Sequence, residues 1–348
     1  MIAKPTRRRI LAAGAASLAD ASIACSMSAR AQTADREALI AAAKREGKVV
    51  VYSAYLSQNT HGPIDEMFFA RYGIAIEHFN GRGNELRERI RVEQLTGRFI
   101  GDVQHNAATQ TLIAAPVDHN IEPIGVLPNA ARLTREFRAR ADEFQVPIFT
   151  LNYGFLINSA LVPVGSEPKT WGDLLDPRWK GKILFDDPRA PGGGRVMFHQ
   201  TVDRYGRAYQ EALAQQKPEL SRDYGEAARR LARGEFAIYV PLIFSQAELL
   251  KGLPVRTVIP EDGVTYGAYC VSILKNPPHP NAARLLADFY LSDEVQALYA
   301  RTGHGVVIEN LAADLTPEAR VLANVKPLVA EDFTRIDQYL AMAKEIYR

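Results

Sequence analysis

The chain has 348 residues, of which 47% are hydrophobic and 24% are charged. This composition is typical of globular proteins, and the length suffices for two domains. The 42 basic and 40 acidic residues nearly cancel, so no positive excess indicates binding to nucleic acid or to an anionic membrane.

The first 31 residues are expected to form an export signal that is removed. A basic segment at residues 6–9 precedes a weakly apolar, alanine-rich run and then Ala-Arg-Ala at 29–31, a typical cleavage pattern. The run is too short to span a membrane, and its arginines resemble a twin-arginine export signal. An ordinary basic N-terminus and lipid attachment at Cys25 are the alternatives. Cleavage removes five basic residues and one acidic residue, leaving 37 and 39, and leaves Cys270 with no partner for an internal disulfide.

The remaining chain alternates between helical and strand patterns. Apolar periodicity, glycine stops and short apolar runs predict these elements. The expected helices lie at 35–47, 64–72, 84–96, 171–175, 224–232, 281–290, 293–302 and 334–347, with another starting at 196, and the expected strands lie at 48–52, 74–78, 102–105, 146–157, 183–185, 236–240 (ending at Pro241), 255–259 and 266–274.

This alternation predicts an α/β protein with parallel sheets covered by helices on both faces. Two long apolar strands, at 146–157 and 266–274, separate two such units, so we expect two lobes joined by a hinge. The first lobe is expected over 32–150 and 266–312, and the second over 151–265. The helices of 313–348 are expected to pack across both lobes.

Motifs of common enzymes are missing from the sequence. It contains no phosphate loop GxxxxGK[ST], no GxGxxG, no GxSxG, no HExxH and no paired CxxC. The seven histidines show no metal-ligand spacing, and His61 and His304, each beside glycine, are the two most worth locating in the fold. We therefore expect a protein that binds a solute rather than an enzyme, with no cofactor and no metal.

Three consecutive glycines follow the strand at 183–185. Gly192, Gly193 and Gly194 lie at the carboxyl end of that strand and before the next helix, where parallel sheets bind ligands. Backbone N–H groups at such a helix start favour a phosphate, phosphonate or carboxylate, and Arg195 adds a charge-assisted contact. The alternative is a flexible turn with Arg195 in water.

Several stretches resemble the extracellular solute-binding proteins of ABC importers, in the branch that includes ferric-iron, phosphonate and sugar-phosphate binders. The resemblance covers essentially the whole mature chain, and its most specific parts are PKTWGDLLDPRWKGKI at 168–183 and the stretch at 277–292. Further matches lie at 81–86 and 101–103. The resemblance implies a type II periplasmic-binding-protein fold, with two doubly wound sheets joined by two crossing strands, and closure of the lobes on ligand.

The iron binders of that branch resemble one another in a pair of adjacent tyrosines. This chain has Leu242 and Ile243 where that pair is expected, and no clear counterpart of the iron binders' histidine and glutamate near 52–57. This departure disfavours ferric iron.

Other candidate ligand contacts follow strands or lie near their ends. Arg82, between two glycines, is a candidate anion clamp, and Ser53 and Asn106 are candidate hydrogen-bonding groups, although each alternatively caps a helix. Asp187 is a candidate partner for a ligand ammonium, or an Asp-Pro turn residue. The tyrosines expected either to pack on the ligand's carbon skeleton or to belong to the core are Tyr52, Tyr153 and Tyr239.

Together these features predict a monomeric periplasmic binding protein that captures a small anionic organic solute and delivers it to an ABC permease in the inner membrane. The alternatives are a ferric-iron carrier and a secreted enzyme.

Overall fold

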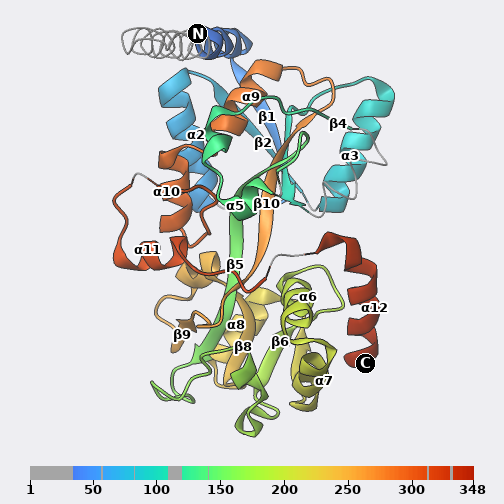
Figure 1. Ribbon diagram of the computed structural model, residues 1–348, viewed down its shortest axis with the longest axis vertical. Helices are drawn as coiled ribbons and strands as arrows, with labels where there is room; N and C mark the ends of the chain where they lie inside the picture. The colour runs from blue at the N-terminus through green and yellow to red at the C-terminus, as the bar shows by residue number, and fades with distance from the viewer. Residues whose placement is uncertain are drawn as a thin grey trace, which may run out of the picture.

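The computed structural model describes residues 34–55, 58–81, 83–108, 120–139, 141–311, 313–329 and 332–348. These residues form two lobes stacked along the long axis of the molecule, with strands β5 (Val146–Asn158) and β10 (Thr265–Leu274) running from one lobe into the other (Figure 1). The expected signal of residues 1–31, with Cys25, and Arg82 lie outside the described residues.

The first lobe contains the amino-terminal βαβαβ unit and the helices that follow β10. A helix over 34–46 precedes the unit and ends at Gly47, whose positive φ of 75° suits the left-handed residue after a helix. The elements of this lobe are β1 (Lys48–Ser53), α2 (Gln58–Tyr72), β2 (Ala75–Asn80), α3 (Gly83–Thr96), β3 (Val103–Ala107), β4 (Ile121–Glu122), η1 (Pro128–Arg132), α5 (Arg135–Arg138), α9 (Pro280–Phe289) and α10 (Asp293–Arg301).

The second lobe lies between β5 and β10 in the sequence. Its elements are η2 (Gly172–Leu175), η3 (Pro177–Trp179), β6 (Ile183–Asp186), α6 (Gly193–Tyr205), α7 (Arg207–Gln215), β7 (Glu219–Ser221), α8 (Tyr224–Ala232), β8 (Ile238–Ile243), η4 (Phe244–Leu250) and β9 (Val255–Val258). The carboxyl-terminal segment contributes α11 (Pro317–Ala323), which packs on α10, and η5 (Phe333–Arg335) with α12 (Ile336–Ile346), which packs on α6 and α7.

The described strands form one ten-stranded mixed sheet with a main order of β2-β1-β3-β10-β5-β8-β6-β7. β1 pairs in parallel with β2 and β3, and β6 pairs in parallel with β7 and β8, whereas β5 and β10 are antiparallel to each other. The two expected sheets are therefore linked by continuous hydrogen bonding, because β5 and β10 are long enough to belong to both lobes.

Apolar side chains fill both faces of the sheet in each lobe. In the first lobe, Phe68 and Leu286 belong to the core under α2 and α9, whereas Ile90 of α3 packs on the opposite face. In the second lobe, Phe198 belongs to the core under α6, α7 and α12, and Leu231 to the core under α8. This layering confirms the predicted α/β class.

Three boundaries differ by three residues or more from those expected. Helix α2 begins at Gln58 rather than at Ile64. β8 continues through Pro241 to Ile243, where a stop was expected; the ladder to β6 ends at Val240, so the missing proline N–H breaks no bond to that strand. Helix α6 begins at Gly193 rather than at Val196. β4, α5, β7, α7 and α11 were not expected.

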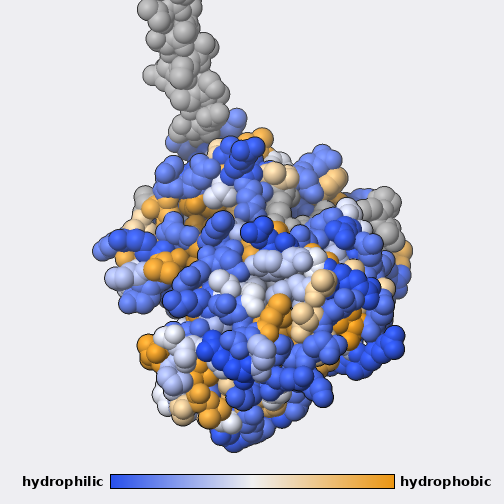
Figure 2. Space-filling model, turned by 60° about the horizontal axis from the view of Figure 1, so that its bottom comes forward, coloured by the Kyte–Doolittle hydropathy of each residue, from blue (hydrophilic) through white to orange (hydrophobic). Residues whose placement is uncertain are grey.

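No helix among the described residues is long and apolar enough to cross a membrane. The face in Figure 2 is mainly hydrophilic, with hydrophobic residues in small scattered groups.

Candidate functional site

In the first lobe, the carboxyl ends of β1 and β3 bring polar side chains together. Ser53 is fully buried; its hydroxyl donates to the carbonyl of Tyr55 at 2.7 Å and lies 3.2 Å from Nδ1 of His105. Asn106 is buried, and its Oδ1 accepts from the N–H of Ala107 at 2.8 Å. Both predicted residues are thus at this sheet edge, and both already make hydrogen bonds within the protein.

Tyr55 was missed by the sequence analysis and lies where the two lobes meet. Its hydroxyl lies 3.1 Å from Oγ of Ser245 in η4 of the second lobe and 3.2 Å from Nε2 of His304. Burial raises the pKa of Tyr55 and lowers that of His304 to about 3, so both groups are neutral at pH 7. Because these partners lie 190 and 249 residues away, no local pattern reveals them.

His61, one of the two histidines singled out in the sequence, belongs to a histidine group beside this edge. Its ring lies 5.2 Å from that of His78 and 5.6 Å from that of His105. Burial lowers the pKa of His105 well below its usual value, and its buried Nε2 has no hydrogen-bond partner. Within the described ranges, no three His, Cys, Asp or Glu side chains are arranged to hold a metal ion.

Tyr52 lies in the core of the first lobe. Its hydroxyl donates to Oε1 of Glu93 at 2.6 Å and accepts from Nε of Arg89 at 3.1 Å. Burial and the neighbouring Glu93 raise its pKa to about 12. Tyr52 points to the face covered by α3, which satisfies its hydroxyl, and this corresponds to the core alternative.

In the second lobe, each glycine of the triplet meets its own structural demand. Gly192 has a φ of 155°, which favours glycine. A Cβ on Gly193 would lie 2.9 Å from the ring of Tyr153, and one on Gly194 only 1.9 Å from the carbonyl oxygen of Asp186. The triplet therefore lets the start of α6 press against β6 and the crossing strand β5.

The helix start already has one anionic neighbour from the protein. Oδ2 of Asp186, the last residue of β6, accepts from the N–H of Gly194 at 2.6 Å. This carboxylate takes one of the donors that the sequence analysis assigned to a ligand anion. The N–H groups of Gly193 and Arg195 are the other amides in the first turn, where helices lack intrahelical acceptors.

Asp187 does not have a carboxylate open to a ligand ammonium. Its Oδ1 accepts from Nε of Arg189 at 2.8 Å, and its Oδ2 accepts from Nε of Arg222 at 2.8 Å. Burial opposes ionisation, but the hydrogen bonds from Arg189 and Arg222 outweigh it and hold the pKa of Asp187 at about 2. The expectation of an ammonium site at Asp187 is corrected on this ground.

Arg195, in the first turn of α6, is partly buried, and its buried Nε has no hydrogen-bond partner. It has no carboxylate within ion-pair distance in the part of the chain that the structure describes. His199 follows one turn later, and its ring is tilted by 32° from that of Tyr339, with the ring centroids 4.4 Å apart. Burial and the charge of Arg195 lower the pKa of His199 to about 3. Among the described residues, no anionic side chain thus pairs with the Arg195 guanidinium.

Tyrosines line the same part of the second lobe. Tyr153 and Tyr239 are buried, and burial together with the charge of Asp186 raises the pKa of Tyr239. The ring of Tyr224 lies 5.9 Å from that of Tyr239, and its hydroxyl is buried without a hydrogen-bond partner. Tyr224 was missed by the sequence analysis because it follows no recognised motif.

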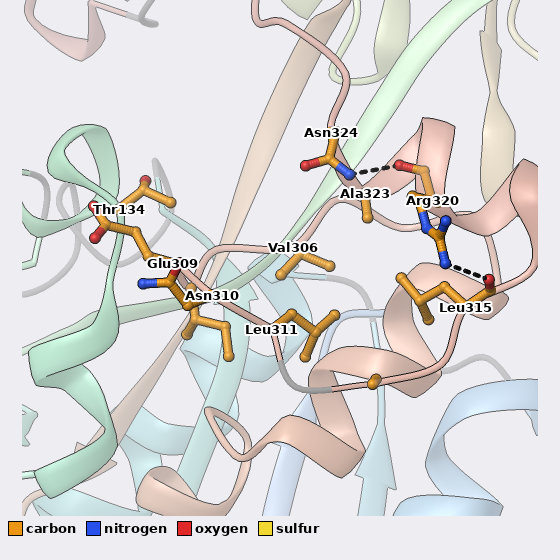
Figure 3. Close-up of a pocket in the computed structure, with 11 residues that line it drawn as sticks. Thr134, Val306, Glu309, Asn310, Leu311, Leu315, Arg320, Ala323 and Asn324 are labelled. Atoms are coloured by element: carbon orange, nitrogen blue, oxygen red, sulfur yellow. Dashed lines mark hydrogen bonds between the residues drawn. The ribbon is translucent and has the colours of Figure 1, made fainter.

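A cavity of about 580 Å³ lies outside this region, between the segment that follows α10 and helix α11. Glu309 and Thr134 lie on one side of it and Arg320 on the other (Figure 3). None of the residues predicted for the ligand site lines this cavity.

Proteins of other bacteria share part of this sequence. A Haemophilus influenzae protein of uncharacterised function is 32% identical over 176 residues, 48% of this chain, and the chain spans about half of that relative (51%). A Salmonella typhi protein, provisionally named as a 2-aminoethylphosphonate-binding periplasmic protein, is 23% identical over 272 residues, covering 72% of this chain and 74% of its own.

Solved structures share the fold. The apo ferric ion-binding protein A of Pasteurella haemolytica matches with a TM-score of 0.70 at 17% identity, over 86% of this chain and 98% of its own. The periplasmic binding protein AfuA of Actinobacillus pleuropneumoniae, solved with exogenous fructose-6-phosphate, matches with a TM-score of 0.64 at 21% identity, over 86% of this chain and 97% of its own.

A family model described as bacterial extracellular solute-binding protein matches residues 100–325, more than half of the chain. With two lobes joined by β5 and β10, and with polar groups at the strand ends of both, the chain belongs to the bacterial extracellular solute-binding proteins.

Proposed function

We propose that this protein is the periplasmic binding component of an ABC importer, and that it captures a small anionic organic solute between its lobes and delivers it to a membrane permease. Membership of the extracellular solute-binding family and the two-lobed fold support the transport role. The solute class is a phosphonate, a phosphate ester or a carboxylate.

The proposal of an anionic solute rests on the environment of Arg195. Its Nε is buried and unpaired in the described structure, and an unsatisfied buried charged donor costs stability unless a ligand binds it. A phosphonate or carboxylate would accept from this guanidinium and from the first-turn amides of α6, where the helix dipole adds to the attraction. Ser53, Arg82 and Asn106 are proposed as the facing groups of the first lobe.

A ferric-iron carrier is the second candidate, and the tyrosines favour it. Phenolate oxygens suit hard cations, and the unpaired hydroxyl of Tyr224 lies beside Tyr239, with Tyr55 and Tyr153 as the other tyrosines of the region. The buried tyrosines have raised pKa values, so the phenolates would form only when a cation binds.

Thermal melts of the protein with 2-aminoethylphosphonate, fructose-6-phosphate, dicarboxylates and ferric citrate test these candidates. A ligand at 100 times its Kd adds about 2.7 kcal/mol, which raises the melting temperature by several degrees. We expect an anionic organic solute to raise it, and Arg195→Ala to weaken that solute's binding by about 10- to 100-fold. Arg204→Ala, which removes an exposed arginine from the same helix, is the matched control.

The same melts separate the alternatives. A shift with ferric citrate alone, together with a visible tyrosinate-to-iron absorption band that Tyr224→Phe removes, would replace the anionic solute with iron. An anion shift that Arg195→Ala leaves unchanged would reject Arg195 as the anchor of the acid group.

A further inference from the structure

Asp186 lies beside the start of α6, and no cationic side chain among the described residues neutralises its carboxylate. Oδ2 accepts from the N–H of Gly194, which fixes the side chain against α6. Oδ1 has no hydrogen-bond partner among the described residues, and no lysine or arginine of those residues lies within ion-pair distance of either oxygen. The side chain is only partly buried, so one oxygen remains to meet a ligand.

The adjacent Asp187 differs from Asp186 in the partners of its carboxylate. Asp187 has two arginines, Arg189 and Arg222, both with Nε at 2.8 Å. Asp186 has no such arginine in the described part of the chain, and burial, reinforced by the charge of Asp187, raises its pKa. A carboxylate kept without a counter-ion costs stability, which a ligand cation would recover.

Asp186 lies beside the site proposed for the acid group of the ligand. The first turn of α6, with Arg195, starts from the same glycine loop, and Gly193 packs against Tyr153 where β5 passes between the lobes. Burial, together with the charge of the nearby Asp186, raises the pKa of Tyr239, so Asp186 and this tyrosine belong to the same region. The unpaired hydroxyl of Tyr224 is a further group available to a polar ligand.

We propose that Asp186 binds the ammonium group of a zwitterionic solute whose acid group is held by Arg195 and the first-turn amides of α6. This inference rests on the proposed function and narrows it to solutes that carry both an acid and an amine. Asp186 repels a simple anion placed beside it, whereas an ammonium on the same solute compensates that repulsion. The carboxylate thereby selects against phosphate and simple carboxylic acids.

Matched ligand pairs test the assignment, because the members of each pair differ by one amine. The pairs are 2-aminoethylphosphonate with ethylphosphonate, phosphoethanolamine with ethyl phosphate, and β-alanine with propionate, each titrated calorimetrically into the protein. We expect the amine member of at least one pair to bind at least about tenfold more tightly than its partner.

Asp186→Asn is the decisive variant, since asparagine keeps an oxygen that accepts from Gly194 while it loses the charge. We expect this variant to lose the preference for the amine and to retain, or gain, affinity for the amine-free partner. Asp223→Asn is the control: Asp223 caps α8 with a bond to the N–H of Glu226 at 2.9 Å, and asparagine caps equally well. It is expected to keep the preference.

The outcomes separate the two levels of the proposal. If the protein binds these acids but shows no amine preference, or if Asp186→Asn keeps the preference, the role of Asp186 is rejected while the anionic-solute function stands. If the protein binds none of these acids and ferric citrate alone raises the melting temperature, the proposed function fails and the role of Asp186 fails with it.

Discussion

Asp186 and Asp187 are consecutive residues with opposite electrostatic environments. Successive side chains of an extended segment point to opposite faces of a sheet. Asp187 accepts hydrogen bonds from Arg189 and Arg222, whereas Asp186 accepts one from the start of α6. Arg189 also donates to the carbonyl of Tyr347 at 2.7 Å, which ties the end of α12 to the loop after β6. Asp187 is thus a structural carboxylate.

Replacing Asp187 with asparagine is expected to destabilise the protein at pH 7 by about 1–3 kcal/mol, because charged hydrogen bonds from two arginines are weakened. The pKa of Asp187 is about 2 in the fold and about 3.9 when unfolded. Its stabilising contribution is therefore complete above about pH 4 and is lost as the pH falls toward 2.

Urea unfolding of wild type and Asp187→Asn between pH 7 and pH 2 measures this difference, which should shrink below pH 4. Asp176→Asn serves as the control, since Asp176 caps η3 and pairs with Arg178 at the surface, where such pairs contribute little. A difference that stays constant over this pH range would contradict the ionic role of Asp187.

At the scale of elements, the start of α6 depends on a close approach between two backbones. The Gly194 Cα lies so near β6 that an added Cβ would come within 1.9 Å of the carbonyl oxygen of Asp186, and backbone there has no room to yield. The same helix ends at Gly206, whose φ is 83° and around which nothing lies within 4 Å of an added Cβ.

Gly194→Ala is expected to lower the free energy of unfolding by more than about 3 kcal/mol, since the helix start must move away from β6. Gly206→Ala meets only a backbone cost of about 1–3 kcal/mol, because a φ of 83° with a ψ of 173° is a conformation that essentially only glycine adopts. Thermal melts of both variants compare the two effects. Equal losses would mean that the glycine loop rearranges freely and that its close packing is unimportant.

Local patterns predicted most elements but only part of the site. The periodic helix at Tyr224–Ala232 and the apolar strands β5 and β10 were recognisable because their own side chains carry the signal. α7 has no side-chain N-cap and packs against η2. α11 does carry a start signal, Thr316 as N-cap followed by Pro317, which the sequence analysis did not use.

The site residues depend even more on distant partners. Strand position alone did not distinguish Tyr52, which turns toward Glu93, from a ligand-facing tyrosine. The difference between Asp186 and Asp187 rests on Arg189, two residues from Asp187, and on Arg222, 35 residues further along the chain. The glycine triplet indicated a close backbone approach, but the helix was expected to begin only at Val196, whereas α6 begins inside the triplet at Gly193.

At the scale of the whole molecule, a hydrogen bond between the two lobes limits how far the lobes separate. Tyr55 follows β1 in the first lobe, and its hydroxyl lies 3.1 Å from Oγ of Ser245, which belongs to η4 of the second lobe. The same hydroxyl lies 3.2 Å from Nε2 of His304, so the contact is anchored in the first lobe as well. A bond across the lobes favours conformations in which they stay near each other.

Tyr55→Phe and Ser245→Ala are each expected to shift the unliganded protein toward more open conformations, because each removes a hydrogen bond of about 0.5–1.5 kcal/mol. That energy changes the ratio of the two populations by a factor of roughly 2 to 13, and small-angle X-ray scattering would record it as a larger radius of gyration. The double variant should open no further than Tyr55→Phe alone, since the two hydroxyls share one bond.

Ser166→Ala is the control, because it removes a hydroxyl that donates to the carbonyl of Pro163 within the second lobe, and it should leave the radius of gyration unchanged. Additive opening in the double variant would mean that the two residues act separately, and that the lobes are not held by this bond.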